Sequence, residues 1–456
     1  MTPLVTMLAL LLAEAEPGVD PCTVPDSERP PDPRCGETLD GRVPAEASTG
    51  RKVGQAALAV PRVATQAVLW PVVKTADAVE NHHVLDWAQA LLTTDDGLVG
   101  VRPELQYSTS FVASGGLRFF YRRLPGPGSE IMLGARTGGP SIVHGEVGLR
   151  GPERYGLSLL ATYDRRNDRL FAGVGPRTEA DLVAVGETPS RYGSDNLGAV
   201  LHWSRRIPFH FVPQAHADVQ RRDYRATDVN GGPSVAETFG LPADQCAARG
   251  LAAPCVDEAA MPGFNHGLRL VRAGGGLMLD LRSPARDGRG FSLATDANFA
   301  RGVAGDPSRH VTLAAESVGA LGGDDRVFLL RARAVMVERL SDAPIPFDEL
   351  FVPSGLQDMR GFPTGRLRGE SGLLGTAEYR WYIAASFDAT LFADVGTVAG
   401  PRFSNIDWSR WFPSFGLGFR YYRPMGAYWD ARARDGIQIA YAPEGGLRLL
   451  FSMAAF

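Results

Sequence analysis

The chain has 456 residues, with 47 Lys and Arg against 51 Asp and Glu, a formal net charge of -4 and a pI near 6.1. This balance gives no basic surface for nucleic acid. No run of about 18 apolar residues occurs, which excludes a helical membrane span, but membrane-crossing strands alternate and escape that test. The length allows two or three ordinary domains or one large barrel, and the 53 glycines and 33 prolines suit many short strands joined by turns.

The N-terminus predicts export. Residues 4–12 form a short apolar core, and Ala13, Glu14 and Ala15 match the small-x-small cleavage pattern, although no Lys or Arg precedes the core. We therefore expect a signal peptide over residues 1–15. Residues 16–50 are rich in Pro, Asp and Glu and have too few apolar residues for a core, so we expect them to be disordered.

The four cysteines fall into two close pairs, Cys22 with Cys35 and Cys246 with Cys255. Neither pair has the C-x-x-C spacing of a metal site. In an oxidising compartment each pair would close a small loop and hold its local geometry. Free thiols remain the alternative.

Residues 51–95 have helical spacing, interrupted by Pro61 and Pro71. This helical segment could plug a barrel lumen or its periplasmic mouth, lie on a membrane surface, or pack on its own chain. His82 and His83 are adjacent and face different ways on a helix, so no metal site is predicted there.

From residue 98 to residue 456 the sequence alternates between apolar and polar positions. Phe291, Leu293, Ala297 and Phe299 share one face of a predicted strand, and residues 209–220 show the same alternation. A sheet with one apolar face fits a soluble sandwich or a membrane barrel. The runs reach the ~9–11 residues that cross a bilayer on a tilt, rather than the ~5–6 usual in soluble proteins, which favours the barrel.

The connections agree with this interpretation. Gaps near Pro125 and Pro208 are short, whereas residues 164–191, 226–263 and 340–370 form long gaps. Short periplasmic turns that alternate with long external loops are typical of an outer-membrane barrel. We expect an all-β fold, an antiparallel transmembrane barrel of about sixteen strands over residues 98–456, after the short N-terminal helical segment. The three glycines at 274–276 lie inside a predicted strand and indicate a bend or bulge.

Residues 359–396 concentrate charged residues in a distinctive order. Arg360 lies in a glycine-rich loop ahead of two alternating strands, which carry Glu378 and Asp394. Because strand side chains alternate with period 2, both acids lie on the less apolar face of their strands.

This stretch resembles the bacterial surface antigen barrel, the membrane domain shared by BamA, TamA and FhaC. The family signature is an R-G-F/Y loop tip followed by an F-x-D-x-G strand. The residues that match it here are Arg360, Gly361 and Phe362, then Phe392, Asp394 and Gly396. The resemblance covers roughly the last 350 residues, and only residues 353–396 are specific.

The resemblance implies that the loop folds back into the lumen and that Arg360 pairs with Asp394 and Glu378. It further implies a bacterial outer-membrane protein with a weak seam between its first and last strands. The expected function is insertion or translocation of proteins or lipids, with polypeptide or lipid clients. A passive pore or structural barrel is the alternative. Without the motif, the favoured interpretation is that Arg360 is a solvated loop residue and Asp394 an ordinary lumen acid.

Two features depart from the family pattern. The roughly 80 residues before the first strand lack the strand pattern of a POTRA domain, which is a βααββ unit, so this looks like a member without POTRA domains. A separate periplasmic partner could supply recognition. The chain ends in Phe456, the aromatic residue expected as an insertion signal, but Ser452 and Ala454 are small where the family prefers bulky apolar residues.

No enzyme is predicted. The sequence has no G-x-S-x-G, Walker or H-E-x-x-H motif, and GESG at 369–372 has the wrong spacing for a nucleophile elbow. We predict no cofactor and no metal.

Overall fold

The computed structural model describes residues 63, 70, 74, 91–94, 96–152, 154–282, 290–323, 326–353, 358–384, 387–421 and 436–453. The predicted signal peptide, the Pro-rich segment, most of the helical segment, and Cys22, Cys35 and Phe456 lie outside these residues. Of the helical segment, Val63, Trp70, Lys74, Leu91 and Leu92 are described, and they are helical.

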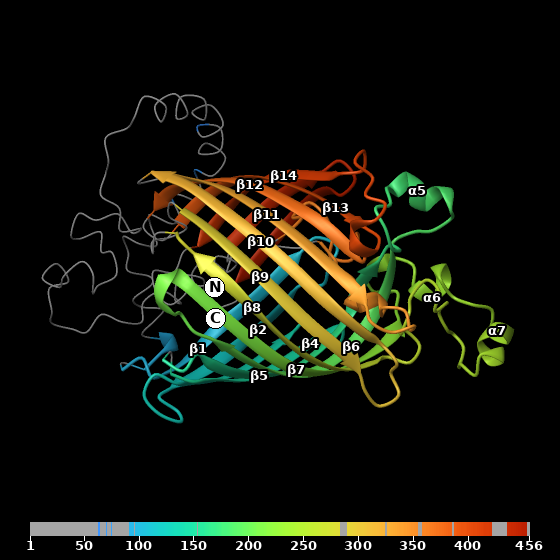
Figure 1. Ribbon diagram of the computed structural model, residues 1–456, viewed down its shortest axis with the longest axis horizontal. Helices are drawn as coiled ribbons and strands as arrows, with labels where there is room; N and C mark the ends of the chain where they lie inside the picture. Colours follow the sequence, from blue (N-terminus) through green and yellow to red (C-terminus); the bar gives the residue numbers. More distant parts are fainter. Residues whose placement is uncertain are drawn as a thin grey trace, which may run out of the picture.

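In the described part of the chain, sixteen antiparallel strands close into a barrel, which confirms the predicted fold class. Each strand pairs with its neighbour in sequence (Figure 1), and the pairing of β1 with β16 completes the ring. The strands are β1 Val99–Ser108, β2 Ser114–Arg122, β3 Glu130–Thr137, β4 Ile142–Arg150, β5 Leu157–Phe171, β6 Ser190–Ser204, β7 Phe211–Ala226, β8 Leu268–Asp280, β9 Gly290–Gly302, β10 Arg309–Gly323, β11 Arg326–Arg339, β12 Ser371–Ala384, β13 Phe387–Ala399, β14 Phe412–Tyr421, β15 Gly436–Ala442 and β16 Gly446–Met453.

The outer wall is an apolar belt. Large hydrophobic side chains alternate along the strands on the outer face and are solvent-exposed in the isolated chain, which would be unfavourable over so wide a surface in water and suits a bilayer. Members of this belt on all sides of the barrel are Leu117, Leu133, Val147, Leu159, Leu201, Val219, Leu277, Leu293, Leu313, Leu330, Phe415 and Leu449.

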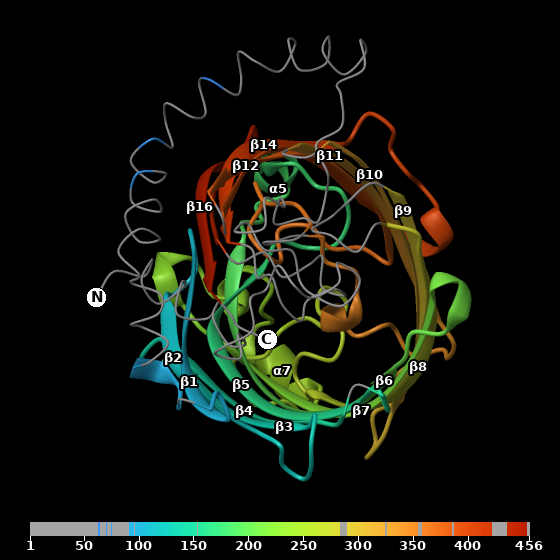
Figure 2. The same cartoon turned by 90° about the vertical axis from the view of Figure 1, so that its left-hand side faces the viewer.

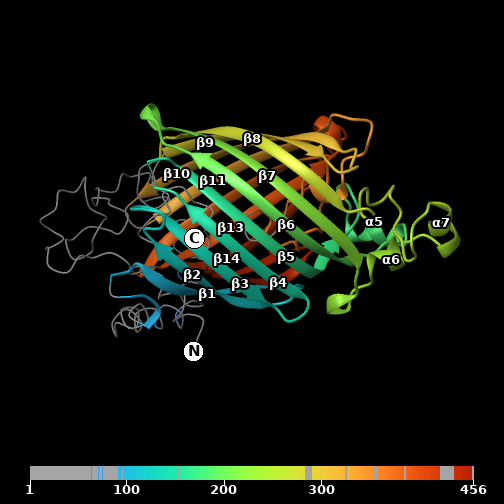
Figure 3. The ribbon, with the colours of Figure 1, turned by 90° about the horizontal axis from the view of Figure 1, so that it is seen from below.

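The two ends of the barrel differ. Both the start of β1 and the end of β16 lie at the end whose connections are short apart from residues 281–289 and 422–435, and the usual outer-membrane layout makes this end periplasmic. The opposite, extracellular end carries the longer loops and the helices (Figures 1 and 3). These short helices are α5 Glu179–Ala184, α6 Val235–Thr238 and α7 Ala243–Ala248, with 3-10 turns η4 Val229–Gly231, η5 Phe347–Glu349 and η6 Pro401–Phe403, while η3 Pro208–His210 lies at the periplasmic end.

Three of the connections at the extracellular end are long. We call residues 172–189 the β5–β6 loop, residues 227–267 the β7–β8 loop and residues 340–370 the lumen loop, which connects β11 to β12. Figure 2 looks along the barrel and shows loop segments inside the ring of strands. None of the described helices is long and apolar enough to cross a membrane.

Two local expectations need correction. Gly274–Gly276 lie in β8 in regular register with both neighbouring strands, without the expected bulge. Glycine is needed there for space instead, because a Cβ on Gly274 would lie 2.6 Å from the His216 ring. The strand expected from residue 209 begins at Phe211, because Phe209 and His210 have φ of 66° and 65° and form a tight turn.

Candidate functional site

Strands β12 and β13 present two carboxylates to the lumen. Thr376 and Asp394 are cross-strand partners, as are Glu378 and Phe392, so all four side chains share the inner face. Glu378 and Asp394 are fully buried. Such charges need partners, because an unpaired buried carboxylate is strongly unfavourable.

Arg360 of the lumen loop supplies the opposite charge. Its Nε and Nη2 donate to the two carboxylate oxygens of Asp394 at 2.8 and 2.7 Å, and its Nη1 donates to Glu378 at 3.1 Å. The guanidinium also lies 3.4 Å from the centre of the Phe392 ring. The side chain is 1% exposed, so bidentate pairing and stacking together hold the loop tip against the wall.

The wall around Glu378 is balanced in charge. Arg380 Nε donates to Glu378 at 2.6 Å, and Arg420 Nη1 lies 3.5 Å from the same carboxylate. Arg420 also pairs with Asp388 at 3.5 Å. Arginines and carboxylates therefore alternate across β12, β13 and β14, and Arg360 completes that network from the loop.

Gly361 fits where a larger residue would not. Its backbone N–H donates to Ser414 Oγ at 3.3 Å. A Cβ at this position would lie 2.5 Å from the Cβ of Ser414 and 2.8 Å from that of Ala442, closer than real Cβ contacts come. The loop backbone thus lies directly on β14 and β15.

Phe362 points into a buried apolar cluster between the loop and the inner wall. Its ring meets that of Phe412 edge-on, with centroids 5.9 Å apart. The cluster excludes water beside the Arg360 network. It consists of Val335, Phe351, Met359, Phe362, Leu367, Leu374, Val398, Phe412 and Ala442.

A second ion-pair site lies on β11. Asp358, two residues before Arg360, accepts from Arg331 at 2.9 Å and from Arg333 at 2.9 Å. Glu316 of β10 shares Arg331 at 2.7 Å. Both charges that flank Met359 are therefore fixed to the barrel wall.

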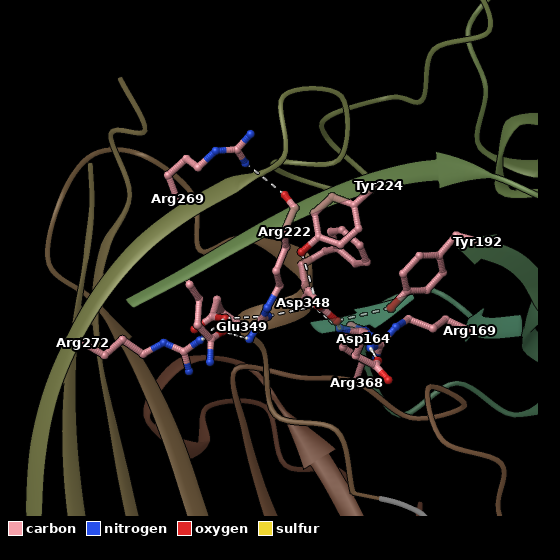
Figure 4. A network of polar contacts seen from close by, with 12 residues as sticks. Asp164, Arg169, Tyr192, Arg222, Tyr224, Arg269, Arg272, Asp348, Glu349 and Arg368 are labelled. Carbon is pink, nitrogen blue, oxygen red and sulfur yellow. Dashed lines mark hydrogen bonds and ion pairs between the residues drawn. The ribbon is translucent and has the colours of Figure 1, made fainter. Parts of the chain in front are cut away.

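A third ion-pair site holds the start of the lumen loop to the opposite wall (Figure 4). Arg222 Nη1 donates to Asp348 at 3.0 Å and to Glu349 at 2.8 Å. His310 Nε2 lies 3.1 Å from Glu349, and the Tyr224 hydroxyl donates to Asp348 at 3.3 Å. These partners come from β7 and β10, so the lumen loop bridges the barrel from that wall to β12 and β13.

The electrostatics of this third site favour ionised acids. Burial alone would raise the pKa of Glu349, but Arg222, His310 and Arg272 outweigh it and lower the pKa to about 2. The pKa of Asp348 is also lowered against burial, chiefly by Arg222. At neutral pH, ionised Asp348 and Glu349 therefore hold the start of the lumen loop to the wall.

Other extracellular loops cover the lumen loop. The Gly175 N–H donates to the Arg368 carbonyl at 2.7 Å, which joins the β5–β6 loop to the lumen loop. A buried, largely aromatic cluster packs the lumen loop against the β7–β8 loop and the inner faces of β5 and β6; its members are Phe171, Tyr192, Val235, Phe239, Val256, Met261, Phe264 and Phe347.

The remaining predicted residues have separate places. Cys246 and Cys255 form a disulfide within the β7–β8 loop, as predicted for that pair. A Cβ on Gly396 of β13 would lie 2.7 Å from Met359 Sδ, so this glycine leaves room for the loop. The described residues contain no cluster of three or more metal-ligating side chains.

Sequence reasoning missed the second and third ion-pair sites. Asp348, Glu349 and Asp358 are isolated acids in a long loop, which resemble ordinary solvated residues. Arginines at alternating inward positions, such as Arg331 and Arg333 on β11, were an available signal for buried pairing.

Comparison with known proteins agrees with the fold of the barrel. The model of the Omp85 superfamily domain matches residues 272–428. The crystal structure of BamA from Haemophilus ducreyi lacking POTRA domains 1-3 is similar at 12% identity, over 78% of this chain and 70% of that chain, with a TM-score of 0.51. At this identity the likeness shows the fold.

CdiB from Acinetobacter baumannii matches at 13% identity over 79% of this chain and 64% of that chain, with a TM-score of 0.44. CdiB from Escherichia coli matches at 13% identity over 77% and 63%, with a TM-score of 0.46. A search of curated proteins gave no match. The described residues include no POTRA domain. The family resemblance expected from the sequence is confirmed: residues 272–428 match the Omp85 superfamily domain, and the chain has the fold of a bacterial outer-membrane β-barrel protein.

Proposed function

We propose that this protein inserts or translocates polypeptides or lipids at the outer membrane, with the lumen loop as its gate. The observation that carries the proposal is the buried contact of Arg360 with Asp394 and Glu378, from a loop that bridges the lumen. The lumen loop makes ion pairs with two opposite sides of the barrel wall and is therefore held in one position. A simple pore does not require such a fixed loop.

The occupied lumen argues against a passive pore, the competing function. Open porins keep a water-filled channel. Here the Arg360 network, the Asp358 pairs and the Glu349 network fix the lumen loop at three places. Substrate passage then requires release of the loop or opening of the wall.

The first and last strands of the barrel are joined by few backbone hydrogen bonds. Among the described residues, β1 pairs with β16 over Leu105–Ser108, whereas it pairs with β2 over Val99–Gln106. Separation of strands costs their ladder hydrogen bonds, so the seam between β1 and β16 is the wall position that opens with least cost. A client strand could pair with the freed edge of β1. A separate periplasmic partner would deliver the client.

A cross-strand disulfide tests the proposal. Tyr107 and Phe451 are seam partners on the outer face, so cysteines at both positions would lock the seam. The matched control locks β14 to β15 through cysteines at Phe415 and Tyr441, which are also outer-face partners. Each variant is reconstituted in liposomes, and the insertion rate of a second barrel protein is measured with and without reductant.

The proposal predicts that the oxidised seam lock abolishes acceleration of insertion, that reductant restores it, and that the control lock has no effect. A wild-type protein that does not accelerate insertion or translocation of any barrel or lipid client would instead favour the passive pore.

A further inference from the structure

Two buried arginines, Arg448 and Arg191, and the half-buried Arg166 surround the short loop that joins β1 to β2, residues 109–113. Arg448 of β16 donates from Nη2 to Ser108 Oγ at 2.6 Å and to the Thr109 carbonyl at 3.1 Å. Arg191 of β6 donates from Nη2 to the Ser110 carbonyl at 2.8 Å. The two guanidinium groups therefore bind the carbonyls of two consecutive residues, Thr109 and Ser110, from different strands.

The third arginine takes the local carboxylate. Arg166 of β5 makes two parallel bonds to Asp168, Nε to Oδ1 and Nη2 to Oδ2, both at 3.1 Å. Asp168 Oδ2 also accepts from the Val112 N–H at 2.8 Å. Arg191 Nη1 donates to the backbone carbonyl of Asp168 at 2.8 Å.

The charges around this loop do not balance. Among the described residues Arg448 makes no ion pair with a carboxylate, and the carboxylate near Arg191 is that of Asp168, which Arg166 already binds with two hydrogen bonds. The like charges of Arg448 and Arg191 also repel each other. Arg448 is 2% exposed and Arg191 is 7% exposed. Within the described part of the chain, Arg448 Nε has no hydrogen-bond partner. Burial of a cation without a counter-charge is strongly unfavourable. Arginines elsewhere in the lumen, such as Arg360, avoid this cost through ion pairs.

Aromatic contact explains only part of the arrangement. The ring of Phe111 lies 5.4 Å from the Arg191 guanidinium and 5.8 Å from that of Arg166. A ring face attracts a cation but supplies neither net negative charge nor an acceptor for Arg448 Nε. A dianionic group with several oxygens would supply both, because guanidinium geometry matches phosphate oxygens.

We propose that Arg448 and Arg191 bind one phosphate-class anion on the inner wall, at the extracellular end of the seam between β1 and β16. The site goes beyond the proposed function, because it would bind whether or not the seam opens. Its position beside the Thr109–Leu449 contact gives the anion two possible sources, a phosphorylated lipid headgroup or free phosphate. Once bound, it would link β16, β6 and the β1–β2 loop.

The test uses the full chain in a maltoside detergent, which contains no phosphate. The temperature at which the folded barrel is lost is followed by heat-modifiable gel migration. Inorganic phosphate is titrated against chloride at equal ionic strength. A second series adds phosphatidic acid to the micelles, with diacylglycerol as the phosphate-free lipid control.

Wild-type protein is expected to gain thermal stability with phosphate and not with chloride. Arg448→Gln and Arg191→Gln should lose this response, and Arg448→Gln should be more stable than wild type without phosphate because a buried unpaired charge is gone. Arg402→Gln removes an exposed arginine from the same end of the barrel and should respond like wild type. Arg448→Lys keeps the charge without the planar fork and should respond more weakly.

The two arms distinguish the source. Stabilisation by phosphatidic acid at lower concentration than inorganic phosphate identifies a lipid headgroup, and stabilisation by inorganic phosphate alone identifies the free ion. The proposal is overturned if wild type shows no specific response to either probe, or if Arg448→Gln responds as wild type does. Should Arg448→Gln not fold, Arg191→Gln and the wild-type anion series still decide.

Discussion

Arg360 and Asp394 form a buried bidentate pair, with both guanidinium-to-carboxylate distances under 3 Å, although one residue lies in a loop and the other in the barrel wall. Through this pair, a loop that begins at the extracellular end is held inside the lumen. The stability of the loop position and the permeability of the barrel should therefore depend on the same contact.

Replacement of Arg360 by Ala should strongly destabilise the closed state. Asp394 and Glu378 would stay buried without the positive charge of Arg360. Removal of one partner from a buried ion pair costs on the order of 3–5 kcal/mol of stability. The temperature of barrel unfolding, measured by gel migration, should fall.

The matched control is Arg402→Ala. Arg402 donates to Glu338 at 2.6 Å, yet its side chain is 74% exposed, so solvent screens the pair and its loss should change stability far less than the loss of Arg360. Equal effects of the two substitutions would contradict the buried role of Arg360.

Gly361→Ala should displace the loop tip from β14. The added methyl group would lie 2.5 Å from Ser414 Cβ, so backbone or wall must move. Protease sensitivity of the lumen loop should increase. Combination with Ser414→Gly removes the closer contact and should restore part of the wild-type protection; the absence of any rescue would show that space is not the reason for glycine here.

Acid should loosen the base of the lumen loop. The folded-state pKa of Glu349 is about 2 against an ordinary value of 4.5, so its ionised form stabilises the fold. That contribution is present above pH 4.5 and is lost as pH falls towards 2. Thermal stability between these limits should decline more steeply in wild type than in Glu349→Gln.

Asp342→Asn provides the control for this pH series, because it removes an exposed carboxylate from the same loop. Its stability should follow the wild-type slope. Identical slopes for wild type and Glu349→Gln would count against the charged network around Arg222.

Reduction of the Cys246–Cys255 disulfide should have a local effect. The bridge closes a span of nine residues, and short loops lie towards the lower part of the ~2–4 kcal/mol range. Proteolysis should accelerate within residues 227–267, while the barrel keeps its heat-modifiable migration. Loss of the whole barrel on reduction would show that this loop holds the wall together.

The sequence predicted the wall better than the loops. Alternation with period 2 was enough to assign Glu378 and Asp394 to one face, because inner and outer side chains face different surroundings. The motif around Arg360 then predicted its partners by resemblance. In the β7–β8 loop, the spacing of Cys246 and Cys255 correctly predicted a closed loop.

Partners across the lumen could not be predicted. Arg222 and Asp348 are 126 residues apart, and their contact depends on the path of the loop through the barrel, which no local pattern encodes. The same holds for Arg448 and Arg191, which come from different strands and bind consecutive backbone carbonyls of the β1–β2 loop. Gly274 misled for a different reason, since β8 has no bulge there and a Cβ at this position would collide with the His216 ring.

Conductance in planar bilayers tests the central claim most directly. If the Arg360 contact holds the loop in the lumen, wild type should show small, infrequent openings, and Arg360→Ala should show large, frequent ones, with Arg402→Ala like wild type. A wide open channel in wild type, or unchanged conductance in Arg360→Ala, would contradict the account.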